Sequence, residues 1–364
     1  MNSSTPRVFI AATRQNDGKT TASLGLIAAL QQHFPRIGYI KPVGQRFVEI
    51  EEQKIDEDTV LMDAVYRMNC PLVDMSPIAV EPAFTRKYLE AANNEALVKR
   101  IQDAFNRVAW EKDFVLCEGS GHAGVGSVFD LSNAQVAKIL GCKVIIVTQG
   151  GIGKPIDEVC LNRALFEKEG VEVIGVIINK VLEEKIPEIT QFVRRGLRRK
   201  GLELLGVLPH EQMLCNPTVD LIRAELRAEP LNKPPTSHAL VGDVVVGAMS
   251  AQNAVQFFKP GVLIITPGDR EDIVLAACAA IDAQNGPKMA GIVLTGGLRP
   301  AENILKLIRT MPIPVLLAQA DSYRVASKVH NLTVKTQPDD AEKISLIRDI
   351  VARHVNVKKI IDSL

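Results

Sequence analysis

The chain has 364 residues, enough for two domains of ordinary size that each bury a core of their own. Its 43 basic and 42 acidic side chains leave a net charge of +1, which argues against binding nucleic acid or an anionic membrane through overall charge. The longest uninterrupted apolar run, Ile273 to Ile281, is far shorter than the ~20 residues that a membrane helix needs. The N-terminus, MNSSTPR, lacks the apolar core of a signal peptide. We therefore expect a soluble, cytoplasmic protein with neither nucleic acid nor membrane as a partner.

Short runs rich in Val and Ile alternate with helical patterns through the first part of the chain. The runs are RVFIAAT, RIGYIKPV, DFVLCEGS, KVIIVTQ, VEVIGVIINK and LLGVLP. This alternation is typical of α/β proteins in which helices cover both faces of a mostly parallel sheet. One basic run, RRGLRRK from Arg194 to Lys200, is expected to be a solvated helix face, with a binding patch as the alternative.

A turn-rich, charged passage follows Pro209 and ends in AEPLNKPPTSH. Its prolines and its lack of periodicity indicate a linker. Beyond it a second series of apolar runs begins: DVVVGAM, GVLIITPG, MAGIVLTGG, IPVLLAQ and LTVKTQ. We place the boundary at about residue 235. Residues 1–235 then hold the first domain with its linker, and residues 236–364 hold a smaller α/β domain that includes a C-terminal helix.

The segment RVFIAATRQNDGKTTASLGLIAAL, residues 7 to 30, has the order of strand, loop and helix that a phosphate-binding loop requires. Gly18, Lys19 and Thr20 form the Gly-Lys-Thr end of the P-loop pattern, but Thr13 stands where that pattern has its first glycine. Backbone amides at the start of the helix can face an anion. We expect Lys19 to reach the β- and γ-phosphates and Thr20 to bind Mg²⁺. The alternative is a plain strand-to-helix turn with a surface lysine.

Acidic residues follow at two further places. Glu118 comes directly after the apolar run from Phe114 to Cys117, so it lies at the carboxyl end of a predicted strand. Ligands collect at that end of the strands in open α/β sheets, and a carboxylate there is well placed to hold Mg²⁺. Asp56 and Asp58, in KIDEDTVLM, are candidates for a second carboxylate. The alternatives are a surface acid in a turn for Glu118 and a solvated helix N-terminus for the two aspartates.

These motifs resemble those of dethiobiotin synthetase and its relatives. The segment ATRQNDGKTTAS is similar to that family's loop, in which a Thr also fills the first-glycine position and a Ser follows three residues after the Lys-Thr. GYIKPV, VLCEGSGH and VIINKV resemble, in the same order, the family's second strand, its acidic strand end and the strand that meets the nucleotide base. The resemblance implies a P-loop NTPase-like fold that binds ATP and Mg²⁺.

The resemblance also implies roles for individual residues. Lys19 and Lys41 become the candidate catalytic residues, because the family's second-strand lysine points at the transferred or terminal phosphate; a strand-end lysine in solvent is the alternative for Lys41. Thr20, Glu118 and, in preference to Asp56, Asp58 become the candidate Mg²⁺ ligands. The candidate nucleotide-binding residues are Thr13, Asp17, Gly18, Lys19, Thr20, Thr21, Gly119, where the backbone would approach the ligand, and Asn179, which would meet the base.

The second half of the chain resembles a DRTGG domain. The segments that carry this resemblance are VVVGAMSAQNAVQFF, GVLIITPGDREDIVLAA and GIVLTGGLRP. From about residue 7 to about residue 320, the order of motifs is similar to the N-terminal regulatory region of long bacterial phosphotransacetylases. If the strands before TPGDRED and LTGGLRP are adjacent and parallel, Asp269, Arg270, Thr295 and Arg299 share one edge. These residues would then form a site for a small ligand or a partner. The alternative is that they belong to ordinary turns with an Arg–Asp pair.

Two functional hypotheses follow. The favoured one is a regulatory protein that binds ATP and Mg²⁺ with weak or no turnover, as a free-standing counterpart of the phosphotransacetylase N-terminal region. It would act on its own assembly as a homo-oligomer, or on a separate acetyl-transfer or acyl-metabolism enzyme. The alternative is an ATP-dependent ligase of the dethiobiotin synthetase type that phosphorylates a carboxylate or carbamate. Gly44 and Gln45, and the long segment from Phe47 to Trp110, depart from that enzyme's pattern.

Overall fold

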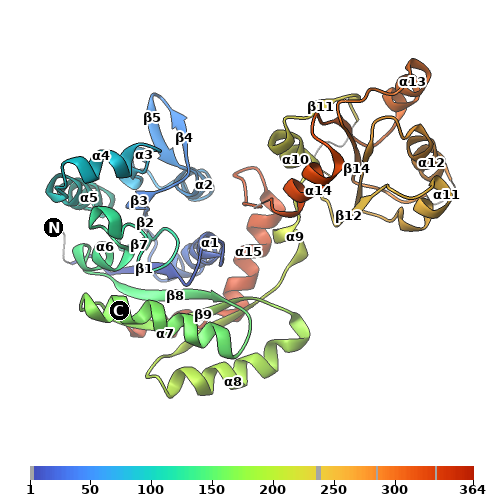
Figure 1. Ribbon diagram of the computed structural model, residues 1–364. Helices are drawn as coiled ribbons and strands as arrows, with labels where there is room; N and C mark the ends of the chain where they lie inside the picture. Colours follow the sequence, from blue (N-terminus) through green and yellow to red (C-terminus); the bar gives the residue numbers. More distant parts are fainter. Residues whose placement is uncertain (1–3, 235–238, 284–285, 333) are drawn as a thin grey trace. The chain divides into compact units, whose positions relative to one another are not determined.

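The computed structural model describes residues 4–234, 239–283, 286–332 and 334–364 (Figure 1). The chain divides into two compact units. The first unit contains Met1–His210 together with Thr336–Leu364, and the second contains Glu211–Lys335. Each unit has its own mostly parallel sheet flanked by helices. Within the described part of the chain, no helix is both long enough and apolar enough to span a bilayer.

The first unit is built on a six-stranded parallel sheet with the strand order β10-β9-β8-β1-β7-β2. Its strands coincide with the six apolar runs of the first series: β1 (Arg7–Ala12), β2 (Ile37–Ile40), β7 (Phe114–Glu118), β8 (Lys143–Gln149), β9 (Val173–Val181) and β10 (Leu204–Pro209). Every residue of β1 and β7 is buried, so both faces of the central strands are covered. The predicted mostly parallel sheet is confirmed, and this two-sided burial explains why the runs are continuously apolar.

Helices and two small sheets complete the first unit, with α1 on one side of the main sheet and α8 on the other (Figure 1). The small sheets pair β3 (Val43–Gly44) with β6 (Ile78–Ala79) and β4 (Phe47–Ile50) with β5 (Gln53–Asp56). The α-helices described in this unit are α1 (Lys19–Leu30), α2 (Glu57–Tyr66), α3 (Leu72–Met75), α4 (Phe84–Glu90), α5 (Glu95–Val108), α6 (Asn133–Ile139), α7 (Gly153–Lys168), α8 (Ile186–Arg198), α15 (Ala341–His354) and α16 (Val357–Asp362). Much of the long segment after Phe47 is therefore regular structure, and its helices α2, α3 and α5 contact β2.

The last residues of the chain pack on the first unit. Helix α15 lies along α1, and the two helices approach so closely that a Cβ at Gly25 would come within 2.3 Å of a Val351 methyl group. Directly after α15, Val355 forms an antiparallel bridge with Gly206 of β10. The C-terminal helix therefore belongs to the first unit and not, as expected from the sequence, to the second. The physical reason is that its apolar face covers α1 and β10.

The second unit has a five-stranded sheet in the order β11-β15-β14-β13-β12, in which all neighbours are parallel except the β11–β15 pair. Its strands are β11 (Glu229–Pro230), β12 (Asp243–Val246), β13 (Val262–Pro267), β14 (Gly291–Thr295) and β15 (Val315–Leu317). Its described α-helices are α9 (Gln212–Cys215), α10 (Val219–Leu226), α11 (Ala251–Ala254), α12 (Glu271–Asp282), α13 (Glu302–Thr310) and α14 (Ser322–His330). Four runs of the second series are thus strands.

The fifth run, LTVKTQ, is not a strand in its described residues, 332 and 334–337. It leads from α14 to α15, and the edge of β15 that it would have extended is already paired with β11. That short edge strand comes from the passage AEPLNKPPTSH, where a proline is tolerated because an edge residue need not donate a ladder hydrogen bond. The sequence pattern alone does not reveal which of the two segments takes the edge.

The described part of AEPLNKPPTSH is consequently not a free linker. Asn232 is buried, and its Nδ2 lies 2.8 to 3.2 Å from three backbone carbonyls, those of Ile308, Met311 and Ile313. These hydrogen bonds hold the passage within the second unit. The units accordingly divide at His210 and not near residue 235, while the end of the passage, residues 235–238, lies outside the described residues.

Candidate functional site

The loop between β1 and α1 closes on itself through Asp17. Oδ2 of Asp17 accepts hydrogen bonds from the hydroxyl of Thr13 and from the backbone amide of Arg14, both at 2.7 Å. The backbone is left-handed at Asn16 (φ 66°) and Gly18 (φ 99°), but not at Thr13. Asparagine tolerates this conformation better than most residues. The first glycine of the P-loop pattern is therefore not needed here, because the turn is made later and the Thr13 side chain holds it.

Gly18 packs directly against Asn179 at the end of β9. A Cβ at Gly18 would lie 2.0 Å from Asn179 Nδ2, so a larger residue would displace the amide. Nδ2 of Asn179 donates to the Asp17 carbonyl at 2.9 Å, and its Oδ1 accepts from the Lys180 amide at 2.9 Å. Asn179 therefore shapes the loop. Its expected contact with a nucleotide base stays a prediction.

Helix α1 begins immediately after the loop with Lys19. This side chain is buried, and its Nζ donates to the Gly121 carbonyl at 3.3 Å. Burial lowers the pKa of Lys19, and attraction by the Glu118 carboxylate opposes that effect. Thr20 and Thr21 follow, both half-buried, in the first turn, where helix amides have no intrahelical acceptor. The first turn of α1 thus carries an ammonium group, two hydroxyls and free backbone amides.

Glu118 ends β7, the strand next to β1 in the sheet, and its side chain is fully buried. Its Oε1 accepts a hydrogen bond from the Thr20 hydroxyl at 3.1 Å, and its Oε2 accepts one from the Tyr39 hydroxyl at 3.2 Å. Burial raises the pKa of Glu118, although the nearby Lys41 ammonium acts in the opposite direction. Because β1 and β7 are parallel neighbours, the start of α1 lies beside the end of β7. Two predicted site residues, Thr20 and Glu118, therefore come into contact.

Lys41 follows β2 and lies among three buried carboxylates. Its Nζ forms an ion pair with Asp58 and lies 3.0 Å from Asp56 Oδ1 and 3.8 Å from Glu118 Oε1. Burial alone would lower the pKa of Lys41, but the carboxylates hold that pKa above its ordinary value. Burial raises the pKa of Asp56. With all four groups ionised, the cluster has two negative charges in excess. We call these four residues the Lys41 cluster.

The loop after β7 is fixed by Asn133 of α6. Its Oδ1 accepts from the Ser120 amide at 3.1 Å, and its Nδ2 donates to the carbonyls of Ser120 at 2.7 Å and His122 at 2.6 Å. A Cβ at Gly119 would lie 2.6 Å from Asn133 Oδ1. The observed reason for glycine at residue 119 is therefore this close side chain, and the expected approach of a ligand to the Gly119 backbone stays a prediction.

Two residues of the site were missed from the sequence. Tyr39 precedes Lys41 by two positions, and side chains two apart along an extended segment share one face, so the sequence did contain a signal for it. Asn133 carried none, since its contact with the loop after β7 depends on how α6 packs. Asp56 was ranked below Asp58, yet both contact Lys41.

The residues expected to form a site in the second unit have separate partners. Arg270 pairs with Asp272 at 2.8 Å, and Arg299 pairs with Glu229 at 2.5 Å. The hydroxyl of Thr295 lies 2.7 Å from the hydroxyl of Ser322, the first residue of α14. The Arg–Asp pair of an ordinary turn accounts for Arg270, and a pair with an acid of edge strand β11 accounts for Arg299.

Comparisons with known proteins give the chain a family. Residues 6–218 match a protein-family model described as an AAA domain, and residues 221–332 match one described as a DRTGG domain. A phosphate acetyltransferase from Nitratidesulfovibrio vulgaris is 28% identical over 96% of this chain and 50% of its own length. One from Pseudomonas aeruginosa is 29% identical over 96% of this chain and 50% of its own length. The chain thus spans about half the length of the curated relatives it matches.

Among solved structures, the CBS and DRTGG domains of the regulatory region of Clostridium perfringens pyrophosphatase, complexed with the activator diadenosine tetraphosphate, are 21% identical to this chain. That likeness covers 48% of this chain and 86% of the other, with a TM-score of 0.29. The AAA domain model alone matches more than half of the chain. The resemblance to phosphotransacetylases and to DRTGG domains is confirmed, and the chain belongs to the AAA domain family, with a DRTGG domain following the first domain.

Proposed function

We propose that the chain binds a nucleoside triphosphate with Mg²⁺ at the carboxyl edge of the first sheet, as a regulatory module with weak or no turnover. The observation that carries this proposal is the hydrogen bond between Thr20, at the start of α1, and the buried Glu118 at the neighbouring strand end. A phosphate-binding loop beside a strand-end carboxylate is the arrangement that phosphate and its metal ion require together.

The phosphates would lie over the start of α1. Lys19 is buried, and its Nζ donates to a neutral carbonyl, that of Gly121, so a phosphate oxygen would add a charge-assisted contact. The free amides in the first turn of α1 would add hydrogen bonds, and the helix dipole favours an anion there. Thr13 and Asp17 would hold the loop in shape rather than contact the ligand, because their side chains already bond to one another.

The donor set at this edge fits Mg²⁺. Thr20 offers a hydroxyl and Glu118 a carboxylate, and Asp58 is a further carboxylate in the Lys41 cluster. Within the described residues, no group of three or more His, Cys, Asp or Glu side chains has the arrangement of a complete metal site. Mg²⁺ does not need one, since it is commonly held by one or two protein oxygens together with phosphates and water. The bound ion would neutralise phosphate charge, and it would also offset the negative excess of the cluster.

The position of Lys41 supports weak or absent turnover. Its ammonium group is engaged by Asp56 and Asp58, so it would have to leave two carboxylates to act on a transferred phosphate. Gly44 is close to the same cluster: a Cβ there would lie 2.6 Å from Asp56 Oδ2. The segment that departs from the dethiobiotin synthetase pattern is thus packed against carboxylates, which supports a regulatory role over a ligase.

The relatives suggest what is regulated. Both phosphate acetyltransferases match this chain with about half of their length, so a catalytic partner of that class, or a second copy of this chain, is the proposed target. Nucleotide at the loop would then alter the affinity for that partner, and by linkage the partner would alter the affinity for nucleotide.

Calorimetric titration with ATP, ADP and AMP, with and without Mg²⁺, tests the binding step. We expect Mg²⁺-dependent binding of ATP, and Lys19→Ala should weaken it about 10- to 100-fold, because one charge-assisted contact to phosphate is lost. Lys138→Ala is the matched control, since Lys138 is an exposed lysine of the same unit that pairs with Glu169. Equal binding by wild type and Lys19→Ala would contradict the proposal.

Turnover is tested separately, by following ADP release. The regulatory proposal expects little ADP with MgATP alone and no increase on adding diaminopelargonate and bicarbonate. Rapid ADP release that depends on such a second substrate would replace this proposal with the ligase alternative.

A further inference from the structure

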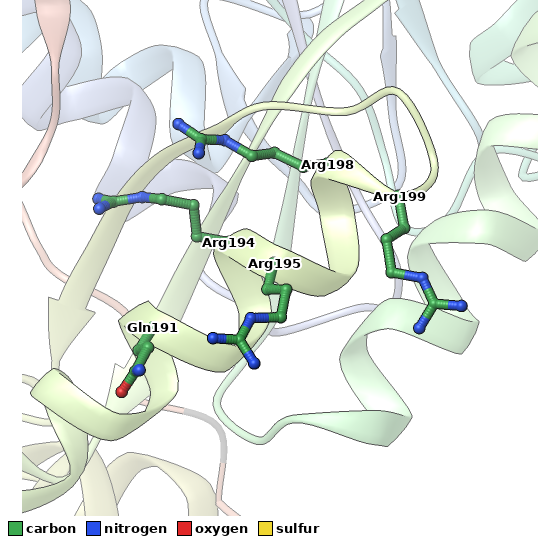
Figure 2. A pocket seen from close by; sticks show the side chains of 5 residues that line it. All are labelled: Gln191, Arg194, Arg195, Arg198 and Arg199. Carbon is green, nitrogen blue, oxygen red and sulfur yellow. The ribbon is translucent and has the colours of Figure 1, made fainter.

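The exposed face of α8 carries a pocket that the proposed function does not use. It has a volume of about 420 Å³ and is lined by Gln191, Arg194, Arg195, Arg198 and Arg199; we call it the arginine pocket (Figure 2). On the opposite face of the same helix, Ile189, Val193 and Leu197 are buried. The arginines therefore face solvent because of the helical repeat, and all four belong to the first unit.

In the described part of the chain, the four arginines of the pocket have no carboxylate partner. Among the residues that the structure describes, none of them forms an ion pair. Nine other arginines do: Arg14, Arg36, Arg107, Arg163, Arg223, Arg270, Arg299, Arg309 and Arg324. Glu203 accepts a hydrogen bond from Lys359 at 2.6 Å, which lowers the pKa of Glu203, and Arg198 and Arg194 add a smaller effect through space. In the described part of the chain, the pocket's positive charge is therefore not neutralised by a direct ion pair.

A helix dipole explains cations in the last turn of α8, but it does not explain why four arginine side chains line one pocket without an ion pair to any described residue. Guanidinium is a planar fork of donors that binds phosphate oxygens in pairs. The volume of the pocket lies within the range of sites that hold small molecules, roughly 300–1,000 Å³. The net charge of +1 and the confinement of the cluster to one end of one helix do not suit a nucleic-acid surface.

We propose that the arginine pocket binds a small anion with two or more phosphate groups. Two sources share this chemistry, inorganic polyphosphate and a nucleotide. Phe192, whose side chain is 43% exposed, precedes Arg195 by three positions and so lies beside it on the helix. A base stacked on that ring would favour the nucleotide, whereas inorganic polyphosphate gains nothing from it.

The test uses the full chain with Lys19→Ala, so that the loop before α1 does not contribute and the result is independent of the proposed function. Tripolyphosphate is titrated calorimetrically at low ionic strength into this protein and into the same protein with Arg194→Gln and Arg198→Gln. We expect saturable binding that the two added substitutions weaken at least ~10-fold, through loss of charge-assisted contacts. Arg86→Gln with Arg100→Gln is the matched control, because it removes equal charge from exposed positions elsewhere in the unit and should change nothing.

Further ligands decide the chemistry. ATP that binds more tightly than tripolyphosphate, with a difference that Phe192→Ala removes, identifies the nucleotide; equal binding identifies the inorganic anion. Citrate should bind at least ~10-fold more weakly than tripolyphosphate, because it lacks phosphate geometry. Failure of the Lys19→Ala protein to bind tripolyphosphate, an equal loss in the control pair, or tighter binding of citrate or of a polyglutamate peptide would each overturn the proposal.

Discussion

The two units have similar loops at the carboxyl ends of parallel strands, but they treat charge in opposite ways. In the first unit, Lys41 and Glu118 are almost fully buried, in a cluster with more carboxylates than ammonium groups. In the second unit, Arg270 and Arg299 remain at least partly exposed, and each has an acid of its own. The same kind of strand end thus holds a buried, unbalanced cluster in one unit and balanced surface pairs in the other.

The difference separates charged side chains that need no ligand from charged side chains that are expected to bind one. An exposed ion pair contributes about 0–1 kcal/mol and costs little to keep. Removing an ion from water costs several kcal/mol even after relaxation, so an excess of buried negative charge is not retained for stability. The Lys41 cluster is therefore expected to serve a ligand that brings positive charge, whereas Arg270 and Arg299 need no ligand to explain them.

The largest expected effect comes from deleting residues 336–364. The deletion exposes the apolar surfaces of α1 and β10 that α15 covers. It also removes buried side chains such as Ile347, Ile350 and Val351, each at most 3% exposed. At about 1.5–3 kcal/mol for each such side chain, the loss approaches the whole net stability of a domain, about 5–15 kcal/mol. We expect the first unit to lose cooperative folding, seen as rapid proteolysis of residues 4–210.

The second unit should survive the same deletion, because its sheet and both of its apolar clusters lie within residues 211–335. A fragment with only those residues is the matched control and should give a cooperative melt. A deleted chain whose first unit keeps its resistance to protease would show that α15 is dispensable there.

Next in size is a pair of matched substitutions. Lys41→Met leaves three buried carboxylates without their cation and should lower the free energy of unfolding by about 3–5 kcal/mol at pH 7. Arg270→Met breaks a partly exposed pair in the second unit and should cost within about 1 kcal/mol. Urea unfolding followed by circular dichroism gives both values. Equal losses would remove the distinction between the two units.

A smaller effect is expected from pH. Burial raises the pKa of both Glu118 and Asp56, so the native state keeps these protons to higher pH than the unfolded chain does. Their contribution to stability is therefore present below their ordinary values of 4.5 and 3.8, and it is lost as pH rises through the raised values. Mg²⁺ competes with the proton on Glu118, so its affinity should rise across that window. Mg²⁺ titrations between pH 5 and 8 measure this, and an affinity independent of pH would contradict it.

Much of the first unit could be predicted from its sequence because its signals are local. Six apolar runs became six strands, and GKT after a strand correctly located the loop and the start of α1. Thr20, Lys41 and Glu118 could be assigned to one edge because parallel strands end together. These positions were predictable because the strand, the turn and the helix around them each have a recognisable sequence pattern of their own.

The errors concern contacts between distant segments. An amphipathic helix such as α15 does not reveal which surface it will cover, and only the three-dimensional structure pairs it with Gly25. The passage around Asn232 resembles a linker because it has no apolar pattern. It is held in place by hydrogen bonds of the buried Asn232 side-chain amide, which a sequence pattern does not reveal. Asn133 is a similar case, since it acts on the site through hydrogen bonds that no sequence spacing specifies.

Hydrogen–deuterium exchange with and without MgATP tests the central claim, that the buried charge of the first unit serves a nucleotide and its metal ion. We expect MgATP to slow exchange in residues 13–30 and 114–122 of the wild-type chain, to leave residues 262–299 unchanged, and to slow exchange in residues 13–30 and 114–122 much less in Lys19→Ala at the same concentration. Peptide-level mass spectrometry resolves all three segments. Unchanged exchange around Lys19, or protection confined to the second unit, would contradict the account.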